Sequence, residues 1–192
     1  MPEPEAKTSA ADEFVVRVAE AGDMASVASI INHYITTTAY NFRTAAQTAD
    51  EWVADWRASR GRYPWLVASD AKGAVLGVAY AGVWNTRAAY DWSAQVTVYV
   101  DAAARRRGIG RALYGVLIPL LDRLGFHAQL GLIALPNPGS VALHEAFGFR
   151  SVGVLREVGH KHGAWRDVGI WQRTADRPGE TPPPTAPPPE RL

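Results

Sequence analysis

A strand, a basic glycine-containing loop and a long helix follow one another at the centre of the chain. Residues 96–100 are β-branched and aromatic, which is typical of a strand. Residues 105–110 contain three arginines and two glycines, and apolar residues at helical spacing then continue to Leu124. The loop predicts an anion site, because free backbone N–H groups and the helix dipole favour negative charge at a helix N-terminus. Glycine lets the anion approach the backbone, and Arg106 and Arg107 add forked donors.

Two other phosphate-binding motifs do not fit this segment. A P-loop needs the pattern G-x-x-x-x-G-K-[ST], which the sequence lacks. The dinucleotide fingerprint needs Gly or Ala three residues after Gly110, where Leu113 stands. A solvated arginine run beside an incidental pair of glycines remains the alternative interpretation.

The two ends of the chain differ in composition from its middle. Residues 1–12 are small and polar, and residues 175–192 contain seven prolines and no aromatic residue. Proline-rich segments favour extended polyproline II and do not close a core. We therefore expect a single folded domain over residues 13–174, flanked by a disordered N-terminal segment, 1–12, and a disordered proline-rich tail, 175–192.

The middle of the chain alternates strand and helix patterns. Strands are predicted near residues 14–19, 65–69, 75–83, 93–100, 130–134, 151–157 and 165–173. Helix starts are expected at Asp23, at the capping box that begins with Thr48, at Gly108 and at Ser140. This alternation predicts an α/β domain in which helices cover both faces of a mixed sheet.

The composition excludes several classes of catalytic and metal-binding site. The chain has no cysteine, which excludes disulfides, thiolate nucleophiles and cysteine-based metal sites. His160 and His162 lack an evident third ligand, so we expect no metal; Lys161 between them either contacts an anion or is solvated.

Charge and hydropathy limit the partners. A net charge of +1 provides no broad field for nucleic acid. No apolar run approaches the roughly 20 residues of a membrane helix. Residues 1–12 carry charges and no apolar signal core. We therefore expect a cytoplasmic protein with no nucleic-acid or membrane partner.

The central loop resembles a known motif. Residues 105–110 read RRRGIG, which is similar to the R/Q-x-x-G-x-G/A motif of the GNAT superfamily of N-acetyltransferases. The resemblance implies the GNAT fold, with a mixed, mostly antiparallel twisted sheet, and acetyl-CoA as co-substrate. It implies that the loop holds the pyrophosphate and that the strand before it binds the pantetheine arm. The cofactor-binding residues carried over on this resemblance are Val98, Tyr99, Val100, Arg106, Arg107, Gly108, Ile109, Gly110, Arg111, Asn137 and Ser140.

Further strings narrow the resemblance to the phosphinothricin N-acetyltransferases. They include NFRT at residues 41–44, RYPWLVA at 62–68 and KHGAWRDVG at 161–169, and the similarity spans about residues 15–172. It implies a homodimer and a small-molecule amine acceptor, namely an amino acid with a second anionic or polar group. The residues that it assigns to the acceptor pocket are Phe42, Tyr80, Arg87, Tyr90 and Thr97.

Acetyl transfer to an amine needs a base, an oxyanion donor and a proton for the leaving thiolate. The resemblance places the oxyanion donor in the backbone at Thr97 and Val98. Its relatives carry a Glu base where this chain has Gln95, and an amide cannot accept the proton. His144 stands where many GNAT enzymes have a tyrosine proposed as general acid, and imidazole titrates near neutral pH. We therefore expect Gln95 and His144 to be the catalytic residues, with a buried packing role as the alternative for His144.

The sequence predicts an acetyl-CoA-dependent N-acetyltransferase that acts on a phosphinothricin-like amine by direct transfer in a ternary complex. Two alternatives stay open. One is an acetyltransferase for methionine sulfoximine or another small amine. The other, suggested by Gln95, is an acyl-CoA-binding protein with little catalysis.

Overall fold

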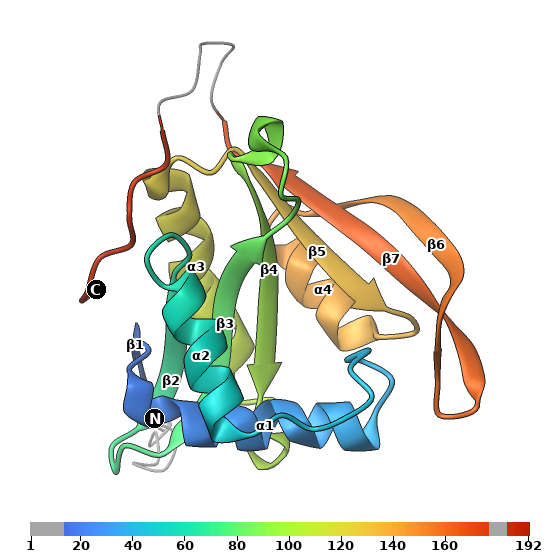
Figure 1. Ribbon diagram of the computed structural model, residues 1–192, viewed down its shortest axis with the longest axis horizontal. Coiled ribbons are helices and arrows are strands. Elements are labelled where there is room, and N and C mark those ends of the chain that lie inside the picture. Colours follow the sequence, from blue (N-terminus) through green and yellow to red (C-terminus); the bar gives the residue numbers. More distant parts are fainter. Residues whose placement is uncertain (1–13, 177–183) are drawn as a thin grey trace, which may run out of the picture.

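Seven strands form one sheet in the order β1-β2-β3-β4-β5-β7-β6. The computed structural model describes residues 14–176 and 184–192 (Figure 1). The strands are β1 (Phe14–Val18), β2 (Trp65–Asp70), β3 (Val75–Val83), β4 (Ser93–Val100), β5 (Ala128–Ala134), β6 (Arg150–Lys161) and β7 (Ala164–Thr174). The helices are α1 (Met24–Thr37), α2 (Ala49–Ser59), α3 (Ile109–Leu124) and α4 (Pro138–Ala146), with short 3₁₀ turns η2 (Ala21–Asp23), η3 (Ala88–Tyr90) and η4 (Ala102–Ala104).

All neighbouring strands are antiparallel except β4 and β5, which are parallel. The predicted mixed, mostly antiparallel sheet is thus confirmed. Strands β6 and β7 form a long hairpin that extends beyond the rest of the sheet at one side of the molecule (Figure 1). Strand β6 is longer than predicted, because it continues through Lys161 to a two-residue turn.

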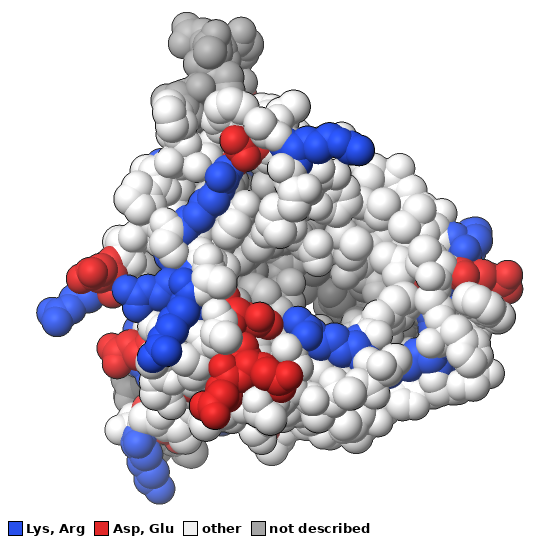
Figure 2. All heavy atoms as spheres, in the orientation of Figure 1, with Lys and Arg blue, Asp and Glu red and all other residues white. Residues whose placement is uncertain are grey.

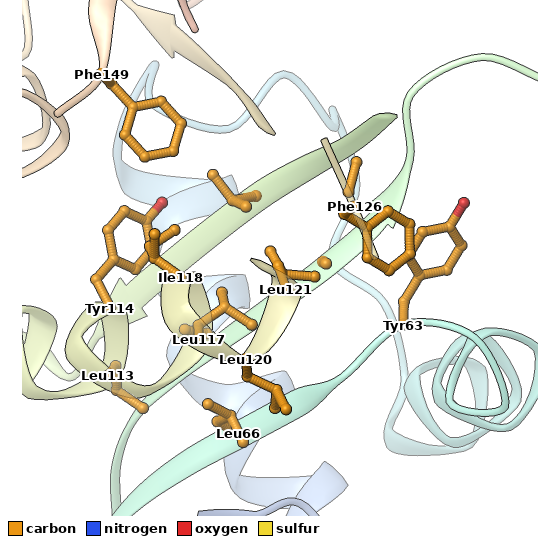
Figure 3. Packing of buried hydrophobic residues seen from close by; sticks show 14 of the residues in the cluster. Tyr63, Leu66, Leu113, Tyr114, Leu117, Ile118, Leu120, Leu121, Phe126 and Phe149 are labelled. Atoms are coloured by element: carbon orange, nitrogen blue, oxygen red, sulfur yellow. The ribbon is translucent and has the colours of Figure 1, made fainter. Parts of the chain in front are cut away.

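Helices cover both faces of the sheet, as predicted. Successive side chains of β2 point to opposite faces. Trp65 and Val67 join α1 and α2 in one buried cluster, whereas Leu66 and Ala68 join α3 in the other. Figure 3 shows the α3 cluster, in which the ring of Phe126 stacks on Tyr63 with centroids 5.5 Å apart. Two cores on one sheet therefore fix α3 against β2, β3 and β4, and α3 begins a few residues after β4 ends.

The capping predictions had mixed outcomes. The box at Thr48 is confirmed, because Thr48 Oγ1 accepts from the Glu51 N–H and the Glu51 side chain accepts from the Thr48 N–H. Asp23 precedes α1 but does not cap it with its side chain, because its carboxylate pairs with Arg17 at 2.7 Å.

The predicted Ser140 cap of α4 is also wrong. The helix begins two residues earlier, at Pro138, and the side chain of Asn137 accepts a hydrogen bond from the Ser140 N–H at 3.2 Å. Asparagine is among the strongest N-cap residues, and proline suits the first turn of a helix.

The described part of the tail touches the domain. Residues 184–192 contain no helix or strand, yet the N–H of Ala186 donates to the carbonyl of Leu124 at 2.8 Å. The predicted disorder of residues 1–12 and of 177–183 lies outside the described residues. Among the helices that the structure describes, none is both long and apolar enough to cross a membrane.

Candidate active site

A cavity opens where β4 and β5 separate. The parallel register pairs Ser93 with Ala128, Ala94 with Gln129 and Gln95 with Leu130, and the two strands then diverge (Figure 1). The cavity has a volume of about 980 Å³ and follows β4 on one side and β5 on the other. Figure 2 shows this face hollowed, with Lys and Arg side chains at the lower rim of the hollow.

Most residues predicted for the site lie along this cavity. Those that line it are Phe42, Tyr80, Gln95, Thr97, Val98, Tyr99, Val100, Arg106, Gly108, Ile109, Gly110, Arg111, Asn137, Ser140 and His144. Arg107, Arg87 and Tyr90 do not line it. Arg87 directly precedes the exposed turn η3 and Tyr90 is its last residue, with 40% of its surface exposed.

The glycine loop forms the basic end of the cavity. Gly108 has a φ of 77°, and Arg106 has a φ of 64°, so the chain turns through left-handed conformations just before α3 begins. The N-cap residue of α3 is Gly108, which has no side chain to accept a hydrogen bond from the N–H groups of the first turn. The N–H groups of this first turn are therefore open to an anion in the cavity.

The three consecutive arginines have different surroundings. Arg105 donates to the hydroxyl of Tyr34 at 3.1 Å, and that hydroxyl donates to the carbonyl of Val100 at 2.6 Å. Arg105 thus ties the loop to α1 and to the end of β4, and it lines the cavity together with Arg106, whereas Arg107 does not line it. Arg105 and Arg106 therefore belong to the cavity wall, and this argues against the alternative in which the arginine run is only solvated.

Aromatic side chains form the other end of the cavity. The rings of Tyr80 and Trp65 stack with centroids 4.0 Å apart and planes within 7°. Asn41 donates to the Tyr99 hydroxyl at 3.0 Å. Burial raises the pKa of Tyr99 to about 12 and raises the pKa of Tyr80 as well. Both phenols are therefore protonated at neutral pH and act as neutral hydrogen-bonding groups.

His144 is buried at the side of the cavity, with 3% of its surface exposed. Its Nδ1 lies 2.8 Å from the carbonyl oxygen of Ser140, and its Nε2 lies 3.0 Å from the hydroxyl of Tyr114. A carbonyl only accepts, so Nδ1 carries the proton and Nε2 of the neutral ring accepts from Tyr114. Burial lowers the pKa of His144, although the Ser140 contact opposes the shift. Burial also raises the pKa of Tyr114, so the pair is uncharged at neutral pH.

Sequence reasoning missed Tyr114, Tyr34 and Asn41, which all line the cavity. Tyr114 belongs to the apolar face of α3, and nothing in its spacing separates it from a core residue. Lys161, for which an anion contact or solvation was expected, does neither. It is buried and donates to three backbone carbonyls. Within residues 14–176 and 184–192, no group of three or more His, Asp or Glu residues is arranged to hold a metal.

The pKa of His144 predicts how stability depends on pH. Its folded-state pKa is lower than its unfolded value of about 6.5, so the unfolded chain binds the additional proton more readily. The stability associated with the neutral ring is therefore complete above about pH 6.5 and is lost as the pH falls. We expect His144→Gln to reduce the drop in Tm between pH 7.5 and pH 5.5, as measured by thermal melting. His127→Gln, at an exposed histidine, should retain the wild-type drop, and an unchanged drop in His144→Gln would contradict the assignment.

Comparison with known proteins agrees with this geometry. Residues 16–170 match the acetyltransferase (GNAT) domain family. The chain is 49% identical over 163 residues to a phosphinothricin N-acetyltransferase from Streptomyces viridochromogenes, which covers 85% of this chain and 88% of the relative. It is 35% identical to an L-methionine sulfoximine/L-methionine sulfone acetyltransferase from Pseudomonas aeruginosa, over 84% of this chain and 94% of the relative.

A solved structure shows the same fold. The crystal structure of a phosphinothricin acetyltransferase from Sinorhizobium meliloti, in complex with acetyl-CoA, superposes with a TM-score of 0.85 at 31% identity. The superposition covers 88% of this chain and 93% of that one. With the family match, the cavity between β4 and β5 and the anion site at α3, the chain belongs to the GNAT family and is an acetyltransferase that uses acetyl-CoA.

Proposed function

We propose that this enzyme acetylates the amine of a small amino-acid-like acceptor such as phosphinothricin, by direct transfer from acetyl-CoA in a ternary complex. The observation that carries the proposal is a single cavity with a basic end at the glycine loop and a neutral aromatic end at Tyr80 and Thr97. A diphosphate suits the first end, and a small polar molecule with an amine suits the second.

The open edge of β4 supports a position for the cofactor between these ends. Beyond Gln95, β4 lines the cavity through Val100, on the side from which β5 has diverged. The pantetheine amides would extend along Val98, Tyr99 and Val100, with the pyrophosphate at the N–H groups of α3. Arg106 and Arg111 would contribute positive charge, and Asn137 and Ser140 would border the cofactor from α4.

Direct transfer places three tasks on residues near the thioester. Gln95 lines the cavity and, as an amide, would orient the amine or a water molecule that takes its proton. A backbone N–H at Thr97 or Val98 would donate to the thioester oxygen as negative charge develops on it. The proton that the amine releases would pass through this water to Nε2 of the neutral His144 ring, and would return from Nε2 by way of the Tyr114 hydroxyl to the departing thiolate. No covalent enzyme intermediate is needed, which suits a chain without cysteine.

We also propose that the enzyme is a cytoplasmic homodimer. Strand β6 is an edge strand of the sheet, and unpaired edges favour association with another strand. Its hairpin carries a set of exposed apolar side chains, namely Val152, Val154, Leu155, Val158 and Trp165. A second copy would cover such a patch.

A panel of amines tests the proposed function. We expect CoA release from acetyl-CoA to depend on phosphinothricin or methionine sulfoximine, as followed with a thiol reagent, with weaker release for common amino acids. Preference for methionine sulfoximine would favour the activity of the Pseudomonas relative instead. A binding protein would be stabilised thermally by CoA without releasing thiol in the presence of any amine.

A substitution at Gly110 tests whether CoA binds at the basic end of the cavity. A side chain at this position would lie 3.4 Å from Leu143 and 3.7 Å from Val100, between α3, α4 and β4 at the cavity. We expect Gly110→Val to weaken CoA binding about tenfold or more in calorimetry, because the added methyl groups occupy the anion approach. Gly115→Val is the matched control in the same helix, since a side chain there meets nothing within 4 Å. Equal affinities of the two variants would remove the case for an anion site at this helix.

Substitutions at Gln95 test how the amine loses its proton. If a missing base limits the rate, Gln95→Glu should raise the amine-dependent turnover, up to the roughly 10²–10⁴-fold value of a well-placed base. The Kd for acetyl-CoA should stay within a few fold. Gln95→Leu, which can neither take a proton nor orient a water molecule, should turn over more slowly than the wild type. Equal steady-state rates for all three proteins would show that this side chain has no part in proton removal.

A further inference from the structure

The wall at the aromatic end of the cavity is a loop without regular structure. Residues 38–48 connect α1 to α2 and contain no helix or strand. This loop brings Tyr40, Asn41 and Phe42 to the cavity. Loops of this kind are held by few interactions of their own, so the position of the wall depends on what the loop contacts.

A buried cation is one of the groups that hold this loop, beside the hydrogen bonds of Asn41 with Tyr99 and of Asn32 with the backbone of Gln47. The Lys161 side chain, in a residue only 7% exposed, donates from Nζ to the carbonyls of Ile35 at 2.6 Å, Asn41 at 2.5 Å and Arg43 at 2.7 Å. An ammonium group has three N–H donors, and all three are used. Ile35 lies in the last turn of α1, where the helix dipole favours positive charge, and the other two carbonyls belong to the loop on either side of Phe42.

The β6–β7 hairpin places Lys161 and supports the loop at two more points. The turn residues His162 and Gly163 have φ values of 52° and 71°, which is the pattern of a two-residue type I′ turn. The ring of His162 lies 3.1 Å from the carbonyl of Thr38 through its Nε2. The ring of Phe42 occupies the space in which a side chain at Gly159 would lie. The hairpin therefore fixes the loop before, at and after Phe42.

We propose that Lys161 is a positioning residue that sets the acceptor-side wall, and thereby the affinity for the amine, without contacting the cofactor. The inference rests on the proposed function, since it assigns the aromatic end of the cavity to the amine. Lysine suits the task because a compact ammonium can direct three donors to three carbonyls around one atom. The planar guanidinium of arginine spreads its donors over three nitrogens and cannot reproduce this arrangement.

Two variants and a matched control test the proposal. Lys161→Met keeps the apolar stem and removes the donors, and Lys161→Arg keeps the charge but changes the donor geometry. Lys72→Met removes a charge from the exposed β2–β3 turn and serves as the control. The measurements are KM and kcat for the best amine of the panel, the Kd for CoA by calorimetry, and amide hydrogen exchange over residues 38–48.

We expect Lys161→Met to raise the amine KM about tenfold or more and to speed exchange in residues 38–48, while the Kd for CoA stays within about threefold. Lys161→Arg should lie between this variant and the wild type, and Lys72→Met should match the wild type. A folded Lys161→Met enzyme with wild-type KM and wild-type exchange would overturn the proposal, as would an equally large loss of CoA affinity.

If Lys161→Met does not fold, Lys161→Arg decides the question by the same measurements. If the wild type acetylates no amine, the proposed function fails by itself. Exchange over residues 38–48 then decides the role of Lys161: faster exchange with unchanged CoA affinity supports it, and unchanged exchange overturns it.

Discussion

The site depends on where the hydrogen bonding between β4 and β5 stops. Two parallel strands pair at Ser93, Ala94 and Gln95 and then diverge, so the remaining length of β4 has an open edge inside the domain. Buried backbone groups must find partners, and an extended ligand with amides can supply them where a strand does not. On β5, Gly131 leaves room for the ring of His144, which occupies the space that a side chain at this position would need. The divergence therefore brings α4 and its histidine against the sheet beside the open strand.

The two ends of the cavity are built by different means. The basic end uses regular structure: the N-terminus of α3, fixed by a large apolar core, and Arg105, which joins the loop to Tyr34 and β4. The aromatic end uses side chains from β3 and β4 and a loop that is held from outside by the hairpin. Under the proposed function, a cofactor end built on regular structure and a separately supported acceptor end would allow the acceptor to differ between relatives without disturbing the shared chemistry.

Local chemistry explains which features could be predicted from the sequence. Strand β4, the glycine loop and α3 follow one another in the sequence, so their combined pattern can be recognised there. The capping box at Thr48 involves only residues 48–51, so it can be recognised in the same way. Asp23 was misassigned because Arg17, on the neighbouring strand β1, competes for its carboxylate. The Ser140 cap was wrong because Asn137 and Pro138 begin the helix earlier.

The features that sequence reasoning missed are non-local. Tyr114 and His144 are 30 residues apart, and the carbonyls that Lys161 contacts lie 118 to 126 residues before it. Backbone carbonyls belong to every residue, so no side-chain pattern marks them as partners. Arg87 matched a family position, yet it lies at the exposed turn η3, away from the cavity of its own chain.

The stack of Trp65 on Tyr80 gives the enzyme an internal optical signal. The two rings are parallel and 4.0 Å apart, Tyr80 lines the aromatic end of the cavity, and Trp65 is almost completely buried behind it. Indole emission responds to the polarity and motion of the groups that touch the ring. A molecule that enters beside Tyr80 would change the surroundings of Trp65 without touching it, whereas one bound only at the glycine loop would lie at the other end of the cavity from the stack. Because the chain has six other tryptophans, Trp65 would report occupancy of the aromatic end in a variant in which those six are replaced by phenylalanine.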